Sequence, residues 1–319
     1  MGRPVQALIY LATLTSASAC GPRVTQEATL DAVYGQRLSK PPGPLRVYHL
    51  GHSLVGQEMP FMLQQLAEEG HSYNSQLGWG ASLKQHYEPS VAVSGFEESN
   101  AHAAYQPLFE AVDAGDLDAF VMTEMVEIAA AVRYHDSAGY LARLARRVSN
   151  ACPEARIYLY ETWHRLDDPL GVRARIRRDR ELFWLGQVLD PALESLDAEV
   201  KIHLIPVGTV IDAFLADVER TDPTGLDGIN TAADLFEDEI HPNDSGWYLI
   251  ALVHYAVLYG ESPRGLPHKL LLPDGSPARA PSARCARRMQ DVTWGVVSED
   301  WRTGLCPRPQ QAAPSAEPR

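Results

Sequence analysis

The segment Leu45-Arg46-Val47-Tyr48-His49-Leu50 is followed directly by Gly51-His52-Ser53-Leu54. The first six residues read as a short buried strand, and the apolar spacing over residues 56–69 predicts a helix after it. Ser53 therefore stands where a strand turns into a helix, so backbone N–H groups at the helix start face the same space as its hydroxyl. A lone serine here is most often a helix N-cap, but with a base nearby it predicts a nucleophile.

The partner of Ser53 is expected far along the chain, in the turn Asp238-Glu239-Ile240-His241-Pro242-Asn243. A histidine and a carboxylate three residues apart can form a proton relay, in which His241 accepts the serine proton and Asp238 fixes the tautomer of the imidazole. Taken alone, His241 reads as a structural or surface histidine. Its pairing with a serine at a strand-to-helix turn favours the catalytic interpretation.

Together with Gly80-Ala81-Ser82-Leu83, these two motifs resemble the SGNH (GDSL-type) hydrolases over residues 45–260. The α/β-hydrolases differ, because their serine lies in Gly-x-Ser-x-Gly, whereas position 55 here is valine. The resemblance implies an α/β fold: a flavodoxin-like three-layer α/β/α sandwich with a central parallel sheet of about five strands. It also implies ester hydrolysis through an acyl-enzyme without a cofactor, with the Ser53 and Gly80 amides donating to the oxyanion. Gly80 could instead be a simple turn glycine.

Alternating apolar patterns predict a single parallel sandwich over residues 45–260. Strands are expected at residues 45–50, 72–79, 118–122, 156–160 and 200–207. Helices are expected at residues 56–69, 104–112, 137–150, 182–196, 209–218, 246–258 and 283–297. Residues 261–306 are predicted to be a C-terminal extension packed on the domain, and residues 307–319 a disordered tail.

The third sequence block departs from the family. Where the resemblance leads us to expect an asparagine that donates to the oxyanion, the chain has Thr123-Glu124-Met125. An ionised carboxylate only accepts hydrogen bonds and would repel an oxyanion. Three interpretations remain open: Glu124 contacts substrate hydroxyls, Glu124 stays protonated, or Thr123 donates instead.

Further candidates for the site follow from chain position. Glu161, Trp163 and His164 come after the fourth predicted strand, at the edge of the sheet where ligands gather. Trp163 could stack on a sugar ring or fill core space. His52, beside the nucleophile, is expected to line the pocket or to donate a hydrogen bond, and not to act as a second base. The arginines between residues 173 and 180 are interleaved with acidic residues and predict a solvated helix face.

Composition excludes some partners. The formal net charge of −13 argues against a nucleic-acid partner. The eleven histidines show no His-x-x-x-His spacing, and the four cysteines show no Cys-x-x-Cys spacing, so no metal site is predicted.

The start of the chain predicts export. Residues 1–19 resemble a signal peptide, with one early charge, an apolar run and the small residues Ala17-Ser18-Ala19. Cys20 follows as in a lipoprotein, so a periplasmic or outer-membrane lipoprotein and a secreted form both remain open. Membrane anchoring is expected only through a lipidated Cys20. Residues 20–44 are predicted to be a linker, and Cys285 and Cys306 the preferred disulfide pair.

The leading hypothesis is an exported serine esterase that removes short acyl or O-acetyl groups from a carbohydrate. Acyl transfer to an envelope glycan would use the same residues. A non-catalytic glycan-binding lipoprotein and a structural envelope lipoprotein are the alternatives from other classes.

Overall fold

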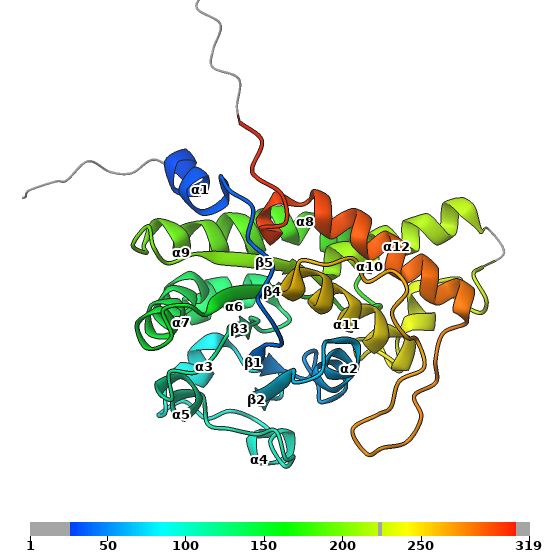
Figure 1. Ribbon diagram of the computed structural model, residues 1–319, viewed down its shortest axis with the longest axis horizontal. Helices are drawn as coiled ribbons and strands as arrows, with labels where there is room; N and C mark the ends of the chain where they lie inside the picture. The colour runs from blue at the N-terminus through cyan, green and yellow to red at the C-terminus, as the bar shows by residue number, and fades with distance from the viewer. Residues whose placement is uncertain (1–25, 223–224, 311–319) are drawn as a thin grey trace, which may run out of the picture.

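The computed structural model describes residues 26–222 and 225–310, and its centre is a parallel sheet of five strands. The strands are β1 (Arg46–His52), β2 (Ser72–Gly78), β3 (Ala119–Met122), β4 (Arg156–Glu161) and β5 (Ile202–Pro206). Their order is β2-β1-β3-β4-β5, and every neighbouring pair is parallel. Helices cover both faces of the sheet (Figure 1). The predicted three-layer α/β/α fold is confirmed, with the doubly wound strand order of flavodoxin-like proteins.

One face of the sheet is covered by five helices. They are α2 (Glu58–Leu66), α8 (Val172–Asp179), α10 (Val207–Thr221), α11 (Asp244–Tyr259) and α12 (Ala283–Glu299). Two of these, α2 and α11, follow the turns that contain Ser53 and His241. Residues of alternate parity on the strands, such as Val121 and Tyr160, meet this layer, as the period of two in a strand requires. The result is one continuous apolar core on this side.

The opposite face is covered by a second set of helices. It comprises α1 (Gln26–Tyr34), α3 (Leu83–Tyr87), α5 (Leu108–Asp113), α6 (Ile128–His135), α7 (Ser137–Ala151), the π-helix η1 (Arg180–Leu189) and α9 (Asp190–Glu194). Phe120 and Met122 point into this layer. The short helices α4 (Phe96–Ser99), η2 (Ala232–Leu235) and η3 (Trp301–Thr303) lie in connections.

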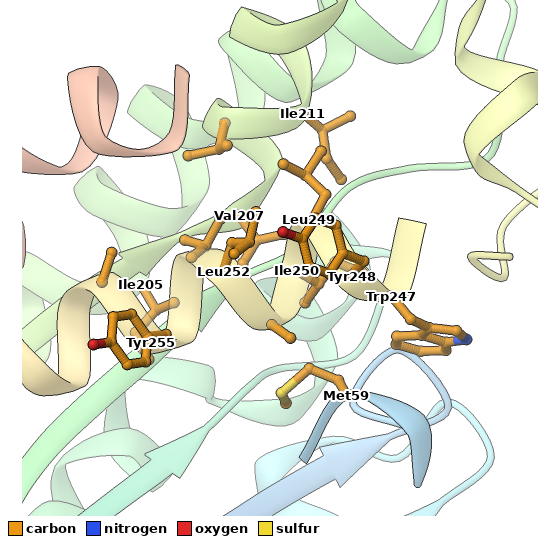
Figure 2. Close-up of a cluster of buried hydrophobic side chains, with 14 of the residues drawn as sticks. Met59, Ile205, Val207, Ile211, Trp247, Tyr248, Leu249, Ile250, Leu252 and Tyr255 are labelled. Atoms are coloured by element: carbon orange, nitrogen blue, oxygen red, sulfur yellow. The ribbon is translucent and has the colours of Figure 1, made fainter. Parts of the chain in front are cut away.

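Helix α11 is the most deeply buried helix element, with 14 of its 16 residues buried. Figure 2 shows Met59 of α2 on one side of α11 and Ile211 of α10 on the other. The Asn243 side chain caps the helix by accepting hydrogen bonds from the amides of Ser245 and Gly246, at 3.0 and 3.2 Å.

The N-terminal part of the described chain differs from the predicted linker. Residues 26–34 form α1, and the buried Tyr34 hydroxyl donates to the Ile202 carbonyl at 2.7 Å. Leu30 and Val33 are buried as well. The few apolar residues of this polar stretch therefore fall on one helix face, which packs on the domain. The predicted signal peptide, Cys20 and residues 311–319 lie outside the described residues.

The C-terminal extension packs on the domain, but not through the expected disulfide. Helix α12 lies against α10 and α11, and the buried guanidinium of Arg302 forms an ion pair with Asp190. Cys285 and Cys306 are free thiols: Cys285 lies in the first turn of α12, and Cys306 lies beyond the other end of this helix. Cys152 is free and buried.

The arginine-rich stretch is less solvated than predicted. Arg173 and Arg177 pair with Asp212 of α10, each at 2.6 Å, and Arg180 reaches the buried Glu161 at 3.2 Å. These contacts attach α8 to α10, and η1 to the carboxyl end of β4. No helix in the described part of the chain is long and apolar enough to cross a bilayer.

Buried histidines make the stability of this fold sensitive to acid. Burial lowers the pKa of nine of the described histidines below the ordinary value of 6.5: His49, His52, His71, His86, His102, His135, His164, His203 and His254. When the protein unfolds below about pH 6.5, these rings take up protons. The unfolded state therefore binds more protons than the folded state, and the free energy of unfolding falls as the pH is lowered. Glu124 and Glu161, whose pKa values burial raises to about 7, oppose this trend but are fewer.

We therefore predict that the melting temperature falls by several degrees between about pH 7 and about pH 5. Circular dichroism at 222 nm or scanning fluorimetry measures this directly. A melting temperature that is constant or rises over the same range contradicts the burial of neutral imidazoles.

Candidate active site

Ser53, His241 and Asp238 come together at the carboxyl end of β1. Nε2 of His241 lies 3.0 Å from Oγ of Ser53, and Nδ1 of His241 lies 2.7 Å from Oδ2 of Asp238. The other carboxylate oxygen of Asp238 accepts the amides of Ile240 and His241, both at 2.7 Å. Burial acts to raise the pKa of Asp238, but the hydrogen bonds from the ring and the amides lower it to about 2. An ionised Asp238 therefore holds the Nδ1 proton, which leaves Nε2 free to accept the serine proton.

The turn that carries Ser53 is fixed by close packing below it. A Cβ atom on Gly51 would lie 2.6 Å from Cγ2 of Thr123 and 2.9 Å from Cγ2 of Val55, so only glycine fits. The Tyr160 hydroxyl of β4 donates to the Leu54 carbonyl at 2.9 Å. The serine thus sits on a turn that is anchored to β3 and β4.

Two buried histidines support the same turn, and neither faces Ser53 as a base. His52 Nε2 lies 2.9 Å from the Glu124 carbonyl, and its Nδ1 accepts the Leu54 amide at 3.3 Å. Because a carbonyl only accepts, Nε2 carries the proton, and burial lowers the pKa of His52 to about 4. Nε2 of His86 lies 2.8 Å from the Gly51 carbonyl and donates to it. His52 therefore matches the hydrogen-bonding alternative; the role of His86 was missed by the sequence analysis.

The turn that carries His241 is held from β4. Trp163 is buried in the core, and its indole N–H donates to the Ile240 carbonyl at 2.9 Å. The Leu166 amide donates to the Glu239 carbonyl at 2.7 Å. Of the two interpretations of Trp163, burial favours core packing over stacking on a sugar, because the ring has almost no exposed surface. Its contact with the histidine-bearing turn makes it a positioning residue.

Gly80 lies beside the Ser53 turn. In the β1–β2 register His52 is opposite Gly78, so the two turns that follow these strands are neighbours. Gly80 adopts φ +57°, and nothing lies within 4 Å of the position its Cβ would take. Within the described chain, the Ser53 and Gly80 amides make no hydrogen bond. Both amides are therefore available to a ligand.

Glu124 and Thr123 do not face the cavity that contains Ser53. The Glu124 carboxyl is fully buried and accepts the amides of Met125 and Leu83 at 2.8 and 3.3 Å. Burial raises its pKa to about 7, which fits the protonated alternative better than substrate contact. The Thr123 hydroxyl donates to the Tyr160 carbonyl at 2.8 Å, so it is not free for an oxyanion. Glu124 instead connects the end of β3 to the start of α3.

A cavity of about 400 Å³ opens over Ser53 and His241. Its other lining residues are Gly56, Gln57, Glu58, Leu77, Trp79, Ser99, Glu237, Pro242, Asp244, Trp247 and Leu272. Three of these side chains are acidic and none is lysine or arginine. Trp79 is 59% exposed and its ring lies against Gly95. The cavity therefore suits a neutral or cationic ligand that can lie against an aromatic ring.

Searches for similar proteins show the fold alone. No family model and no curated protein matches the sequence. A DUF4886 family protein from Bacteroides uniformis superposes with a TM-score of 0.53 at 14% identity, over 80% of this chain and 95% of that chain.

Two further solved structures are more distant. A putative GDSL-like lipase from Parabacteroides merdae has a TM-score of 0.41 at 15% identity, over 70% of this chain and 99% of that chain. A carbohydrate esterase family 2 enzyme with a carbohydrate-binding domain from Corynascus thermopiles has a TM-score of 0.38 at 11% identity, over 70% and 69%. At these scores neither bears on the function of this chain.

Within the described residues, no group of three or more His, Cys, Asp or Glu side chains could hold a metal ion.

The packing of Gly51 gives a direct test of how rigidly the serine turn is held. We predict that Gly51→Ala destabilises the protein by about 1–3 kcal/mol, because the added methyl overlaps Thr123 and Val55. Gly295→Ala, on α12 where nothing lies within 4 Å, is the matched control and should stabilise slightly. Urea denaturation measures both variants. An equal midpoint for Gly51→Ala and the wild type would mean that the turn relaxes freely.

Proposed function

We propose that this protein is a serine esterase of the SGNH type that hydrolyses carboxylic esters through an acyl-enzyme. The single observation that carries the proposal is the hydrogen-bonded series from Asp238 through His241 to Ser53, which ends in an open cavity. The motif resemblance supports the same conclusion independently of the geometry.

The mechanism follows from the roles of the three side chains. Oγ of Ser53 attacks the ester carbonyl as His241 Nε2 takes its proton, and Asp238 stabilises the imidazolium. The carbonyl oxygen becomes negative and is stabilised by the Ser53 and Gly80 amides, each worth roughly 10²–10³ in rate. His241 then gives its proton to the departing alcohol. Water, deprotonated by His241, cleaves the acyl-enzyme and releases the acid.

The cavity supports a small acyl group on a neutral alcohol. About 400 Å³ leaves little room for a long acyl chain beside the alcohol. Glu58, Glu237 and Asp244 in its wall would repel anionic esters. Exposed Trp79 offers a flat apolar face of the kind that stacks on sugars. Short acyl or O-acetyl groups on a carbohydrate are therefore the proposed substrates.

The site of action is proposed to lie outside the cytoplasm. The support is the signal-like pattern of residues 1–19 and the cysteine at position 20. A periplasmic or outer-membrane lipoprotein and a secreted enzyme both fit this pattern.

The esterase proposal is tested with p-nitrophenyl acetate and p-nitrophenyl octanoate. We predict that the wild type hydrolyses the acetate faster, because the cavity is small, and that Ser53→Ala abolishes turnover. The melting temperature of Ser53→Ala should stay within a few degrees, because only one oxygen is lost. Activity that survives this change would disprove the nucleophile. No turnover of either ester by the wild type would favour a non-catalytic glycan-binding protein.

Replacing Asp238 tests the orientation of the base. In Asp238→Asn the amide can donate to Nδ1, so the imidazole carries its proton on Nε2 and cannot accept one from Ser53. We predict that kcat falls roughly 10²–10⁴-fold with a smaller change in KM. Steady-state kinetics on p-nitrophenyl acetate measure this. An unchanged kcat would mean that another group orients His241.

A further inference from the structure

A second cavity, of about 530 Å³, lies next to the one over Ser53. It runs along the outer edge of β2, between the start of α2 and residues 102–104. The Gln57 side chain lines both cavities, and the consecutive residues Leu272 and Pro273 line one cavity each. The two cavities are therefore neighbouring parts of one groove, and Ser53 lies in one of them.

The shared wall is the tip of a hairpin in the C-terminal extension. Residues 270–278 pair through the Leu272 amide to the Ser276 carbonyl at 2.8 Å and the Ala278 amide to the Leu270 carbonyl at 2.9 Å. Gln65 of α2 holds the hairpin by exchanging two hydrogen bonds with the Leu271 backbone, at 2.8 and 2.9 Å. The hairpin is the orange loop between α11 and α12 that projects beside α2 (Figure 1). The extension thus builds part of the groove.

The second cavity is lined by both polar and apolar side chains, and it carries no acidic or basic side chain apart from one histidine. Its polar lining side chains are Gln57, Gln64, Ser72, Tyr73, Asn74 and His102. Burial lowers the pKa of His102, so its ring is neutral at neutral pH. Within the described chain, the Gln57 side-chain amide and the Tyr73 hydroxyl, both partly exposed, make no hydrogen bond to another protein group. A ligand with several hydroxyl groups would pair with these groups, and an aliphatic chain would leave them unpaired.

The register of the sheet gives the distance between Ser53 and the second cavity. His52, next to the nucleophile, is opposite Gly78, and Asn74 lies four residues before Gly78 on the edge strand. Four strand residues span about 13 Å, which is longer than one sugar ring. A ligand that is bound at Ser53 and also fills the second cavity must therefore be longer than a monosaccharide.

We infer that the second cavity binds the alcohol part of the substrate, and that this part is a neutral oligosaccharide of at least two units. This inference rests on the proposed esterase function and names the substrate of the same site. The ester carbonyl lies at Ser53, and the sugar chain continues past Gln57, under the hairpin tip and along the edge of β2. Hydrolysis then leaves the chain intact and removes only its acyl group.

The test compares acetylated glucose with acetylated cellotriose and acetylated xylotriose, with acetate release measured for the full chain. In the wild type, kcat/KM on at least one trisaccharide should exceed that on the monosaccharide by about tenfold or more. Asn74→Ala and Tyr73→Phe should each reduce this ratio severalfold. Tyr73→Phe removes only a hydroxyl, so it keeps the test valid if Asn74→Ala folds poorly. Asn150→Ala, an exposed change on α7 at the opposite face of the sheet, is the matched control and should keep the wild-type ratio.

The possible results distinguish failure of the oligosaccharide inference from failure of the esterase proposal. If p-nitrophenyl acetate and the acetylated glucose are hydrolysed but both trisaccharides give a ratio near one, the oligosaccharide inference is wrong and the esterase stands. If p-nitrophenyl octanoate is preferred and its hydrolysis rises in Tyr73→Phe, because the hydroxyl left unpaired by an acyl chain is gone, the second cavity holds an acyl chain and the inference is overturned. If no ester is hydrolysed by the wild type, the proposed function fails and the inference with it.

Discussion

The hydrogen bond between His241 Nε2 and Ser53 Oγ joins residues 188 positions apart in the chain. Such a contact exists only if both turns are held to within a few tenths of an ångström, because neither side chain is long enough to compensate for movement. The serine turn is fixed by Gly51 against β3, and the histidine turn by the N–H of Trp163 and by the capped start of α11. The sheet and the buried helix α11 therefore fix the distance between His241 Nε2 and Ser53 Oγ.

Much of this support is polar and buried. His52 and His86 each donate to a backbone carbonyl of the strand ends, and Glu124 accepts amides from two loops. Such groups cost desolvation energy, which the hydrogen bonds to these partners partly offset. An apolar residue at these positions would pack but would not fix the direction of the backbone. Burial holds both histidines neutral, so they position the turn without competing with His241 for protons.

The sequence predicted the five strands and the proximity of Ser53, His241 and Asp238, because strands have a local signal in short apolar runs and Asp238 and His241 have a chemically specific spacing. The errors arose where the signal was not local. The polar stretch before β1 contains a helix whose Tyr34 hydroxyl donates a hydrogen bond to β5. The sequence pattern of residues 26–34 does not indicate which strand this helix contacts. The proposed cysteine pair failed because the length of α12 separates the thiols. The second cavity depends on a hairpin, residues 270–278, that the sequence placed only within a C-terminal extension.

The most direct test of a Ser53 nucleophile activated by His241 is covalent labelling of the folded protein by a fluorophosphonate, with the modified residue identified by peptide mass spectrometry. The account predicts one adduct, on Ser53, absent in Ser53→Ala and formed far more slowly in His241→Ala. It would be contradicted by wild-type protein that stays unlabelled, or by an adduct on Ser53 that forms equally fast without His241.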